Sequence, residues 1–136
     1  MLKEQLKNEE LLKAVKKILE KFHVDVIILF GSRARGDYKP WSDYDILIIA
    51  NFREKYLDRI AEILELLNEI KITIEPHPYT LKEAIEMLKK GNPIIVDAIS
   101  EGLILYEGEG LKELLKVYEE LLKKGLKKSE VSIILP

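Results

Sequence analysis

Residues 31–45 read GSRARGDYKPWSDYD, and this polar stretch separates two short apolar segments. Val24–Phe30 precedes it, and Asp43–Ala50 carries the second apolar run. Both runs are too short for buried helices and are rich in aliphatic and β-branched residues, which predicts two buried strands. The stretch between them has room for little more than a helical turn, so the two strands could pair antiparallel.

Working outward from this stretch, helical and strand patterns alternate along the chain. The alternation predicts an α/β fold with a small mixed β-sheet and helices packed on it. Capping-box spacing occurs at Asn51–Glu54 and at Thr80–Glu83, and Asn92-Pro93 suits the start of a short helix, although the Ile94–Val96 run after it also suits a strand. Helices are predicted at residues 2–22, 56–67, 80–88 and 111–124, with a short one beginning at Asn92-Pro93. Further strands are predicted at residues 71–75, ending before Pro76, and 103–106.

Length and composition limit the class of protein. The 136 residues predict one domain, 1–136, with an N-terminal helix at 2–22, a motif-bearing core at 23–107, and a C-terminal helix and tail at 110–136. Cysteine is absent, which excludes disulfides, thiol chemistry and cysteine-bound metals. A net charge of −2 and the lack of long apolar runs predict a cytoplasmic protein that does not bind membranes or nucleic acid broadly. The Lys- and Glu-rich composition indicates a thermophilic source.

The acidic end of the stretch predicts a metal site. Asp43 and Asp45 are two residues apart at the start of a strand, so both side chains lie on one face, about 6.6 Å apart at the backbone. Two converging carboxylates repel each other unless a cation neutralises them. Mg²⁺ prefers one or two carboxylates together with phosphate oxygens.

The glycine end of the stretch predicts a phosphate site. Gly31 allows a tight turn and close approach of the backbone to a ligand. Ser32 offers a hydroxyl and an N–H at the start of a helical turn, where phosphate is favoured. Arg33, Arg35 and Lys39 add positive charge in the same loop. Phosphate donors beside metal ligands suit a nucleoside triphosphate bound with Mg²⁺.

The spacing Gly31-Ser32, ten residues, Asp43-x-Asp45 resembles the signature of the DNA polymerase β-like nucleotidyltransferase superfamily. The chain is most similar to its minimal nucleotidyltransferases, single-domain proteins often encoded beside a HEPN-domain protein. The resemblance extends over residues 20–107 and implies the polymerase β-like nucleotidyltransferase fold. It also implies a third carboxylate on a neighbouring strand, for which Glu75 is the candidate, although many members have Asp at this point.

The chemistry that the resemblance implies is two-metal transfer of a nucleoside monophosphate, AMP from ATP, to an acceptor hydroxyl with release of pyrophosphate. Asp43, Asp45 and Glu75 are then the metal ligands and catalytic acids, and Glu75 is the candidate base. The residues expected to bind the nucleotide are Gly31, Ser32, Arg33, Arg35 and Ser42.

The acceptor is open to more than one interpretation. The resemblance implies a HEPN-domain toxin, modified on a tyrosine, so that the chain acts as its antitoxin. A partner chain or a homodimer could supply the acceptor surface. One alternative is an antitoxin that acts by protein contact, with a weak catalytic site. Another is transfer to a small molecule such as an aminoglycoside, or to an RNA 3′ end, which the negative net charge disfavours.

Three further features have less specific interpretations. Trp41 is expected to pack the loop, with base stacking as the alternative if the ring is exposed. His77, between Pro76 and Pro78, is expected to be a rigid loop residue, with a place at the rim of the site as the alternative. The apolar tail 131–135 either docks on the body of the protein or contacts another chain.

Overall fold

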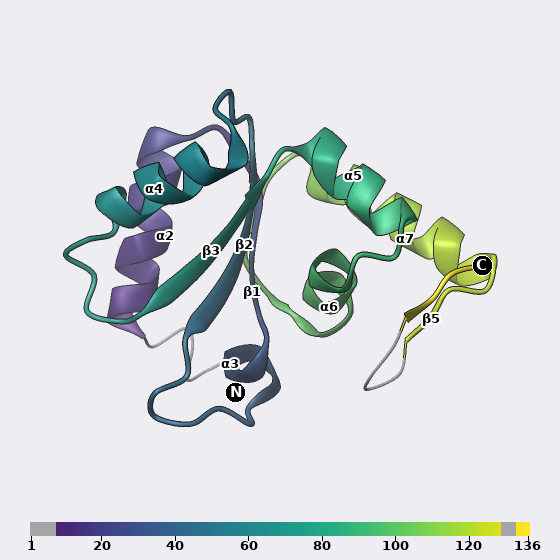
Figure 1. The fold of residues 1–136 in the computed structure, drawn as a ribbon, viewed down its shortest axis with the longest axis horizontal. Helices are drawn as coiled ribbons and strands as arrows, with labels where there is room; N and C mark the ends of the chain where they lie inside the picture. The colour runs from purple at the N-terminus through teal and green to yellow at the C-terminus, as the bar shows by residue number, and fades with distance from the viewer. Residues whose placement is uncertain (1–7, 129–132) are drawn as a thin grey trace.

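The computed structural model describes residues 8–128 and 133–136. A four-stranded mixed sheet carries helices on both faces, which confirms the predicted α/β class (Figure 1). The helices are α2 (Glu9–Lys21), α3 (Ser32–Arg35), α4 (Tyr56–Leu66), α5 (Leu81–Lys89), α6 (Pro93–Glu101) and α7 (Leu111–Lys123). The strands of the sheet are β1 (Val24–Phe30), β2 (Tyr44–Ala50), β3 (Ile74–Tyr79) and β4 (Leu103–Glu107), and β5 (Lys127–Lys128) pairs with β6 (Ile133–Ile134) in a separate hairpin.

The strand order in the sheet is β3-β2-β1-β4. Strand β1 pairs antiparallel with both β2 and β4, whereas β2 and β3 are parallel. The expected antiparallel pairing of β1 and β2 is therefore confirmed. It follows from the short connection between them, which holds only the four-residue helix α3 and a loop. The parallel pair needs a longer crossover, which α4 supplies.

Strands β1 and β2 are covered on both faces, which explains their uninterrupted apolar runs. Ile46 and Ile48 belong to the core between the sheet and helices α2 and α4. Leu47 and Ile49 belong to the core between the sheet and helices α5, α6 and α7 (Figure 1). Successive residues of a strand alternate between faces, so Asp45 lies on the same face as Leu47. The sheet therefore positions this acid on the side of α5–α7.

Strand β3 corrects the prediction for residues 71–75. That strand was expected to stop before Pro76, but β3 is Ile74–Tyr79 and includes both Pro76 and Pro78. Proline is tolerated here because β3 is an edge strand, which needs backbone hydrogen bonds on one side only. The period-two alternation continues through both prolines, so the odd-numbered residues of β3 share one face.

The expected helix caps are confirmed at two of three positions, and α4 begins at residue 56 as predicted although its expected cap is absent. Thr80 and Glu83 form the capping box of α5, with Glu83 N–H to Thr80 Oγ1 at 3.2 Å and Thr80 N–H to Glu83 Oε1 at 2.8 Å. Asn92 caps α6, so the apolar residues after it are helical. The box at Asn51–Glu54 is wrong: α4 begins later, and the Glu54 carboxylate accepts the preceding backbone N–H instead.

The two ends of the chain are described in part. Helix α2 confirms the N-terminal helix from residue 9 to residue 21, and residues 1–7 lie outside the described residues. Residues 131–132 of the apolar tail also lie outside them. The rest of the tail docks on the body, because a Cβ built at Gly91 would lie 2.8 Å from the side chain of Leu135. Across residues 8–128 and 133–136, no helix combines the length and apolarity needed to cross a membrane.

Candidate active site

The turn after β1 is shaped around a carboxylate. Gly31 has φ 73° and ψ −158°, a backbone conformation that residues with a side chain rarely adopt. A Cβ built at Gly31 would lie 2.6 Å from Oδ2 of Asp45. Glycine is therefore required for its backbone conformation and for the space that it leaves. The consequence is that Oδ2 of Asp45 faces the turn that leads into Ser32.

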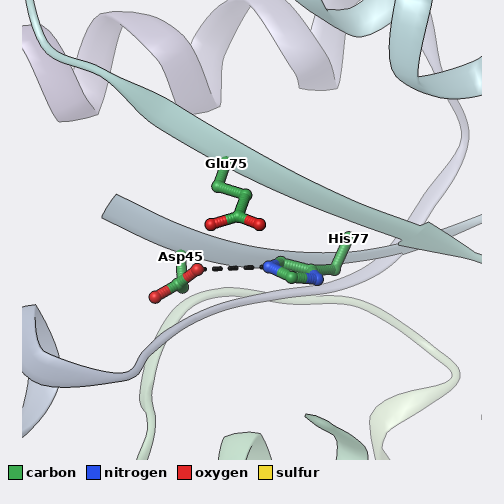
Figure 2. Close-up of side chains that lie close together, drawn as sticks. All are labelled: Asp45, Glu75 and His77. Carbon is green, nitrogen blue, oxygen red and sulfur yellow. Dashed lines mark hydrogen bonds and ion pairs between the residues drawn. The ribbon is translucent and has the colours of Figure 1, made fainter. Parts of the chain in front are cut away.

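Three donor groups converge beside this turn. Asp45 and Glu75 are register partners across the parallel pair β2–β3, and His77 follows Glu75 by two residues on the same face. One ligand atom from each of the three residues lies within 4.8 Å of the other two. Nε2 of His77 lies 3.2 Å from Oδ1 of Asp45, and the Glu75 carboxylate lies beside this pair (Figure 2). Two carboxylates at this spacing offer oxygen ligands to a divalent cation, and the imidazole lies within hydrogen-bond distance of one of them.

The ionisation of Glu75 shows the effect of this convergence. Partial burial raises the pKa of the Glu75 carboxyl, and the hydrogen bond to Asp45 and the negative charge of Asp45 raise it further. His77 opposes the rise in the pKa, and the charge of Asp43 adds to it. The two neighbouring acids therefore repel each other when both are ionised. A cation between them would remove that repulsion.

Asp43 stands at the rim of this group. It lies one residue before β2 and is exposed. Among the residues that the structure describes, the grouped donors are Asp45, Glu75 and His77, without Asp43. Its charge nevertheless reaches Glu75, since it contributes to the raised pKa of that carboxyl. Two of the three expected acids therefore converge, and the third lies close by.

Arg33 braces the loop between α3 and β2. Its guanidinium donates to the carbonyl oxygen of Pro40 at 3.3 Å and to that of Ser42 at 3.1 and 3.2 Å. It also stacks on the rings of Tyr38 and Tyr44, at 4.3 and 4.4 Å from their centroids. These contacts hold the loop that carries the chain into the acidic strand.

The tip of the same loop is a tight turn over residues 39–42. The Ser42 N–H donates to the Lys39 carbonyl at 3.0 Å, and the Lys39 N–H donates to the Ser42 hydroxyl at 2.9 Å. The Ser42 hydroxyl thus serves the turn, whereas Ser32 begins α3 directly after Gly31. Trp41 at the tip is 78% exposed, so the expectation that its ring packs the loop is wrong.

Arg35 is held at the surface by two acids. Its guanidinium lies 3.3 Å from Asp37 and 3.1 Å from Glu101, and both hydrogen bonds raise the pKa of the arginine. Glu101 is shared with Lys128 of strand β5, at 3.1 Å. Arg35 is therefore linked through Glu101 of α6 to strand β5.

His77 is the residue of this site that sequence reasoning placed wrongly. It is not in a loop but within β3, with a side chain 13% exposed and a ring centroid 5.0 Å from that of Phe30. The signal that could have found it is the alternation of Glu75, His77 and Tyr79 on one face of a strand. The flanking prolines conceal that alternation, because a proline in the sequence ordinarily predicts the end of a strand.

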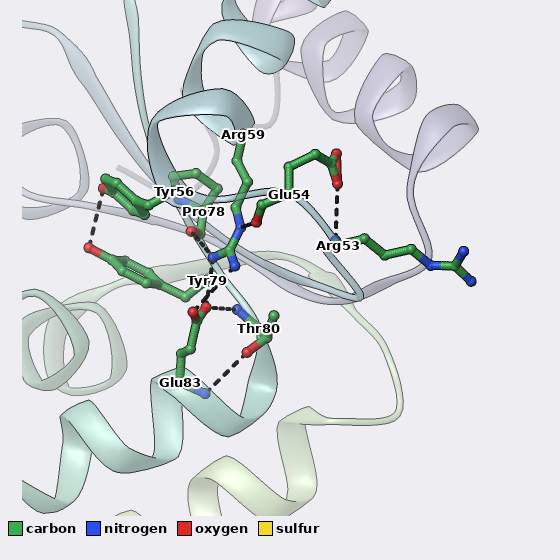
Figure 3. Close-up of polar contacts among 8 residues, drawn as sticks. All are labelled: Arg53, Glu54, Tyr56, Arg59, Pro78, Tyr79, Thr80 and Glu83. Atoms are coloured by element: carbon green, nitrogen blue, oxygen red, sulfur yellow. Dashed lines mark hydrogen bonds and ion pairs between the residues drawn. The ribbon is translucent and has the colours of Figure 1, made fainter.

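A second polar cluster gathers around the other end of β3 (Figure 3). Arg59 of α4 is buried, and it donates to the Glu83 carboxylate at 2.7 and 3.3 Å. It also donates to the carbonyl oxygens of Glu54 at 2.7 Å and Pro78 at 3.3 Å. Glu83 accepts from the Thr80 N–H as well, and these contacts, with Arg59 first, lower the pKa of its carboxyl. This cluster ties α4, β3 and α5 together.

Comparison with known proteins identifies the family. The nucleotidyltransferase domain matches residues 9–132 of the chain. The chain belongs to the nucleotidyltransferase family. It is thus an enzyme of that class, and the resemblance carried by Gly31-Ser32 and the two acids of residues 43–45 is confirmed.

Two relatives of this nucleotidyltransferase come from Methanocaldococcus jannaschii. "Putative protein adenylyltransferase MJ1305" is 30% identical over 127 residues, which cover 89% of this chain and 86% of the relative. "Putative protein adenylyltransferase MJ1379" is 37% identical over 98 residues, which cover 71% of this chain and 91% of the relative.

Two crystal structures share the fold of this nucleotidyltransferase. One, of a toxin-antitoxin with AMP-PNP, matches with a TM-score of 0.53 at 18% identity, over 85% of this chain and 91% of the other. The other, of a mutant of the toxin-antitoxin MntA-HpeT, matches with a TM-score of 0.50 at 17% identity, over 83% and 89%. At these identities the matches establish a common fold, which confirms the polymerase β-like architecture.

Proposed function

We propose that this nucleotidyltransferase transfers AMP from ATP to a hydroxyl of a partner protein, with Mg²⁺ bound at its acids. The observation that carries the proposal is the convergence of Asp45 and Glu75 beside the Gly31 turn. Protein as the acceptor class draws support from the two relatives named as protein adenylyltransferases. The proposed acceptor is a tyrosine of a HEPN-domain toxin, and the toxin-antitoxin structures of similar fold support this choice.

In the proposed reaction the acceptor oxygen forms a bond to the α-phosphorus of ATP. The bond from that phosphorus to the oxygen that bridges to the β-phosphate breaks, and pyrophosphate leaves. The proton of the acceptor hydroxyl passes to Glu75, the proposed base. Asp43, Asp45 and Glu75 would hold two Mg²⁺ ions, which when bound neutralise the triphosphate and favour ionisation of the acceptor hydroxyl.

The triphosphate would lie against the turn that Gly31 and Ser32 form. Arg35 is the proposed phosphate-binding side chain, because phosphate oxygens can replace its exposed partner Asp37, and Glu101 keeps Lys128 as a partner when Arg35 turns away. For Arg33 and Ser42, whose polar groups brace the loop, we propose an indirect contribution to nucleotide binding. Both residues would keep the loop in place while the nucleotide binds.

Calorimetry of ATP binding tests this function. The wild-type protein should bind ATP in the presence of Mg²⁺ and much more weakly without it. The double variant Asp43→Ala, Asp45→Ala should lose the dependence on metal. Glu119→Ala, which removes an exposed carboxylate from α7, is the matched control and should bind as the wild type does. Binding of equal strength with and without Mg²⁺ would contradict the metal-dependent site.

Incubation of a purified HEPN-domain protein with the enzyme, ATP and Mg²⁺ tests the acceptor. Intact-mass analysis should show a gain of one or more AMP groups, and peptide mapping should place them on tyrosine. In cells, the double variant should still bind the toxin but fail to suppress it. Suppression by that variant would favour an antitoxin that acts by protein contact alone.

A further inference from the structure

His77 and Asp45 form a hydrogen bond whose direction follows from their chemistry. Nε2 of His77 lies 3.2 Å from Oδ1 of Asp45. An ionised carboxylate can only accept hydrogen bonds, so the proton must be on Nε2 and the imidazole must donate. One oxygen of Asp45 is therefore engaged by a neighbouring strand.

The imidazole that donates this bond is held firmly in place. His77 lies between Pro76 and Pro78, and the rings of these two residues fix their backbone φ angles. The His77 ring packs against Phe30 of β1, with centroids 5.0 Å apart and planes at 60°, and the side chain is 13% exposed. Because the His77 imidazole has little freedom to move, its hydrogen bond fixes the orientation of the Asp45 carboxylate.

The second oxygen of Asp45 has a different environment. Oδ2 lies 2.6 Å from the point where a side chain on Gly31 would begin, so it faces the turn into Ser32. The carboxylate is thus oriented across the site, with Oδ1 toward β3 and Oδ2 toward the turn where the triphosphate would lie. Glu75 approaches the same group from β3 (Figure 2).

We propose that His77 is a positioning residue, which fixes the Asp45 carboxylate so that Oδ2 is presented to the cation together with Glu75. The proposal rests on the proposed function, because it assigns His77 a task in the same metal site. Without the donor, the Asp45 carboxylate can rotate, and part of the cation affinity is lost. Loss of an outer hydrogen bond to a metal ligand typically weakens metal binding about 10- to 100-fold.

Binding of Mn²⁺ alone, measured from the signal of free Mn²⁺ in electron paramagnetic resonance, tests this proposal without any acceptor or nucleotide. His77→Phe keeps a ring against Phe30 but has no donor, and it should bind Mn²⁺ about 10- to 100-fold more weakly. His77→Gln places an amide N–H near the position of Nε2 and should restore most of the affinity. His77→Asn is too short to reach Asp45 and should resemble His77→Phe. His23→Gln, at the other histidine of the chain, should match the wild type.

Rate measurements add a readout that loss of folding would not produce. In His77→Phe the metal concentration for half-maximal transfer should rise more than the rate at saturating metal falls. Thermal unfolding of each variant shows that the comparison is made between folded proteins. If His77→Phe does not fold, His77→Asn takes its place in the comparison with the wild type.

Three results would overturn the proposal, and they are distinguishable from one another. Equal Mn²⁺ affinity in the wild type and in His77→Phe would show that His77 only packs against Phe30. A ¹⁴N coupling from a bound imidazole in pulsed measurements on the Mn²⁺-loaded protein would make His77 a ligand instead. Failure of the wild type to bind Mn²⁺ at all would contradict the proposed function as well as the role of His77.

Discussion

Strand β3 has a polar cluster near each end. One cluster brings like charges together, whereas the other pairs opposite charges. At the first end, Asp45 and Glu75 bring two acids together, and partial burial, the hydrogen bond to Asp45 and the charge of Asp45 raise the pKa of Glu75. At the other end, buried Arg59 meets the Glu83 carboxylate and two backbone carbonyls, and the pKa of Glu83 is lowered. The first cluster is open to solvent on the Glu75 side, whereas the arginine of the second is buried.

The first cluster has the charges of a cation-binding site, whereas the second is a contact that stabilises the fold. Two acids can lie close together where a bound cation neutralises them, and perturbed pKa values are typical of functional sites. A buried arginine, by contrast, must find its partners within the protein, since an unpaired buried charge is strongly destabilising. Changes at the first end of β3 should therefore alter activity, and changes at the second should alter stability.

Asp45→Asn should give the largest effect and should act on activity alone. Removal of one metal-binding charge costs several kcal/mol of transition-state stabilisation, so the rate of AMP transfer should fall at least about 100-fold. The melting temperature should stay the same or rise slightly, because the repulsion with Glu75 is relieved. Pyrophosphate release and calorimetric melting measure the two quantities. Asp58→Asn, at an exposed acid of α4, should change neither by much. A large loss of stability in Asp45→Asn would contradict the inference that changes in the cluster of Asp45 and Glu75 alter activity and not stability.

Arg59→Ala should do the reverse. It removes the arginine that donates to Glu83 and to two carbonyls, and the free energy of unfolding should fall by about 2–4 kcal/mol, a range reduced for the partial exposure of Glu83. The rate of transfer per folded molecule should stay within about twofold of the wild type. Denaturant titration measures the stability. Arg53→Ala, at an exposed arginine near the start of α4, should cost less than about 0.5 kcal/mol. Equal losses in the two variants would show that the buried cluster contributes little.

Gly31→Ala separates backbone strain from damage to the site. Gly31 and Gly125 both have positive φ values, 73° and 112°, so backbone strain alone should make alanine at either position cost about 1–3 kcal/mol of stability. At Gly125 the nearest atom to an added Cβ is 4.0 Å away, whereas at Gly31 the added Cβ meets Asp45 at 2.6 Å. Only Gly31→Ala should therefore weaken Mn²⁺ binding as well. Normal metal binding in that variant would show that the Asp45 carboxylate is free to move aside.

The pH dependence of stability should have opposite signs at the two clusters, with effects of about 1 kcal/mol or less because both carboxylates are partly exposed. The native pKa of Glu75 is raised above its ordinary value of 4.5, so its contribution is present at low pH and is lost as the pH rises through the native pKa. The native pKa of Glu83 is lowered, so its contribution is present above 4.5 and is lost as the pH falls through the native pKa.

Unfolding titrations of metal-free Glu75→Gln and Glu83→Gln from acidic to neutral pH measure these contributions. Glu75→Gln should gain stability relative to the wild type as the pH rises. Glu83→Gln should be less stable than the wild type at neutral pH, and the deficit should shrink on acidification. If the stability difference from the wild type changed in the same direction with pH in both variants, the contrast between the two ends of β3 would be wrong.

Much of the site was predictable because its signal is local. The fixed spacing from Gly31 to Asp45, with a buried strand on each side, depends only on residues close in sequence. Glu75, predicted as the third acid from a strand-like stretch, lies opposite Asp45 in the parallel pair β2–β3, and its role stays a prediction. The capping boxes show the limit of local rules. Thr80–Glu83 forms one, but at Asn51–Glu54 the glutamate bonds to a neighbouring backbone N–H and the helix starts later.

The rest depends on contacts between distant residues, which a pattern does not reveal. Two prolines hide the strand that carries His77, and only its place at the edge of the sheet makes them acceptable. The sequence around Arg59 does not show that this side chain is buried, because its partner Glu83 lies 24 residues later in the chain. The bracing contacts of Arg33 depend on where its side chain points. The domain limits of 1–136, the thermophilic source and the cytoplasmic location stay predictions.

The exposed indole of Trp41 has a spectroscopic consequence. It is the only tryptophan of the chain, and it stands at the tip of a braced turn two residues before Asp43. Emission excited at the red edge of the absorption band therefore comes from one known position in water. Any molecule that covers this tip should shift the emission to shorter wavelength or quench it. The unlabelled protein thus carries a fluorescent reporter of contact near its candidate active site, with which binding of the proposed nucleotide and of the proposed protein partner can be compared.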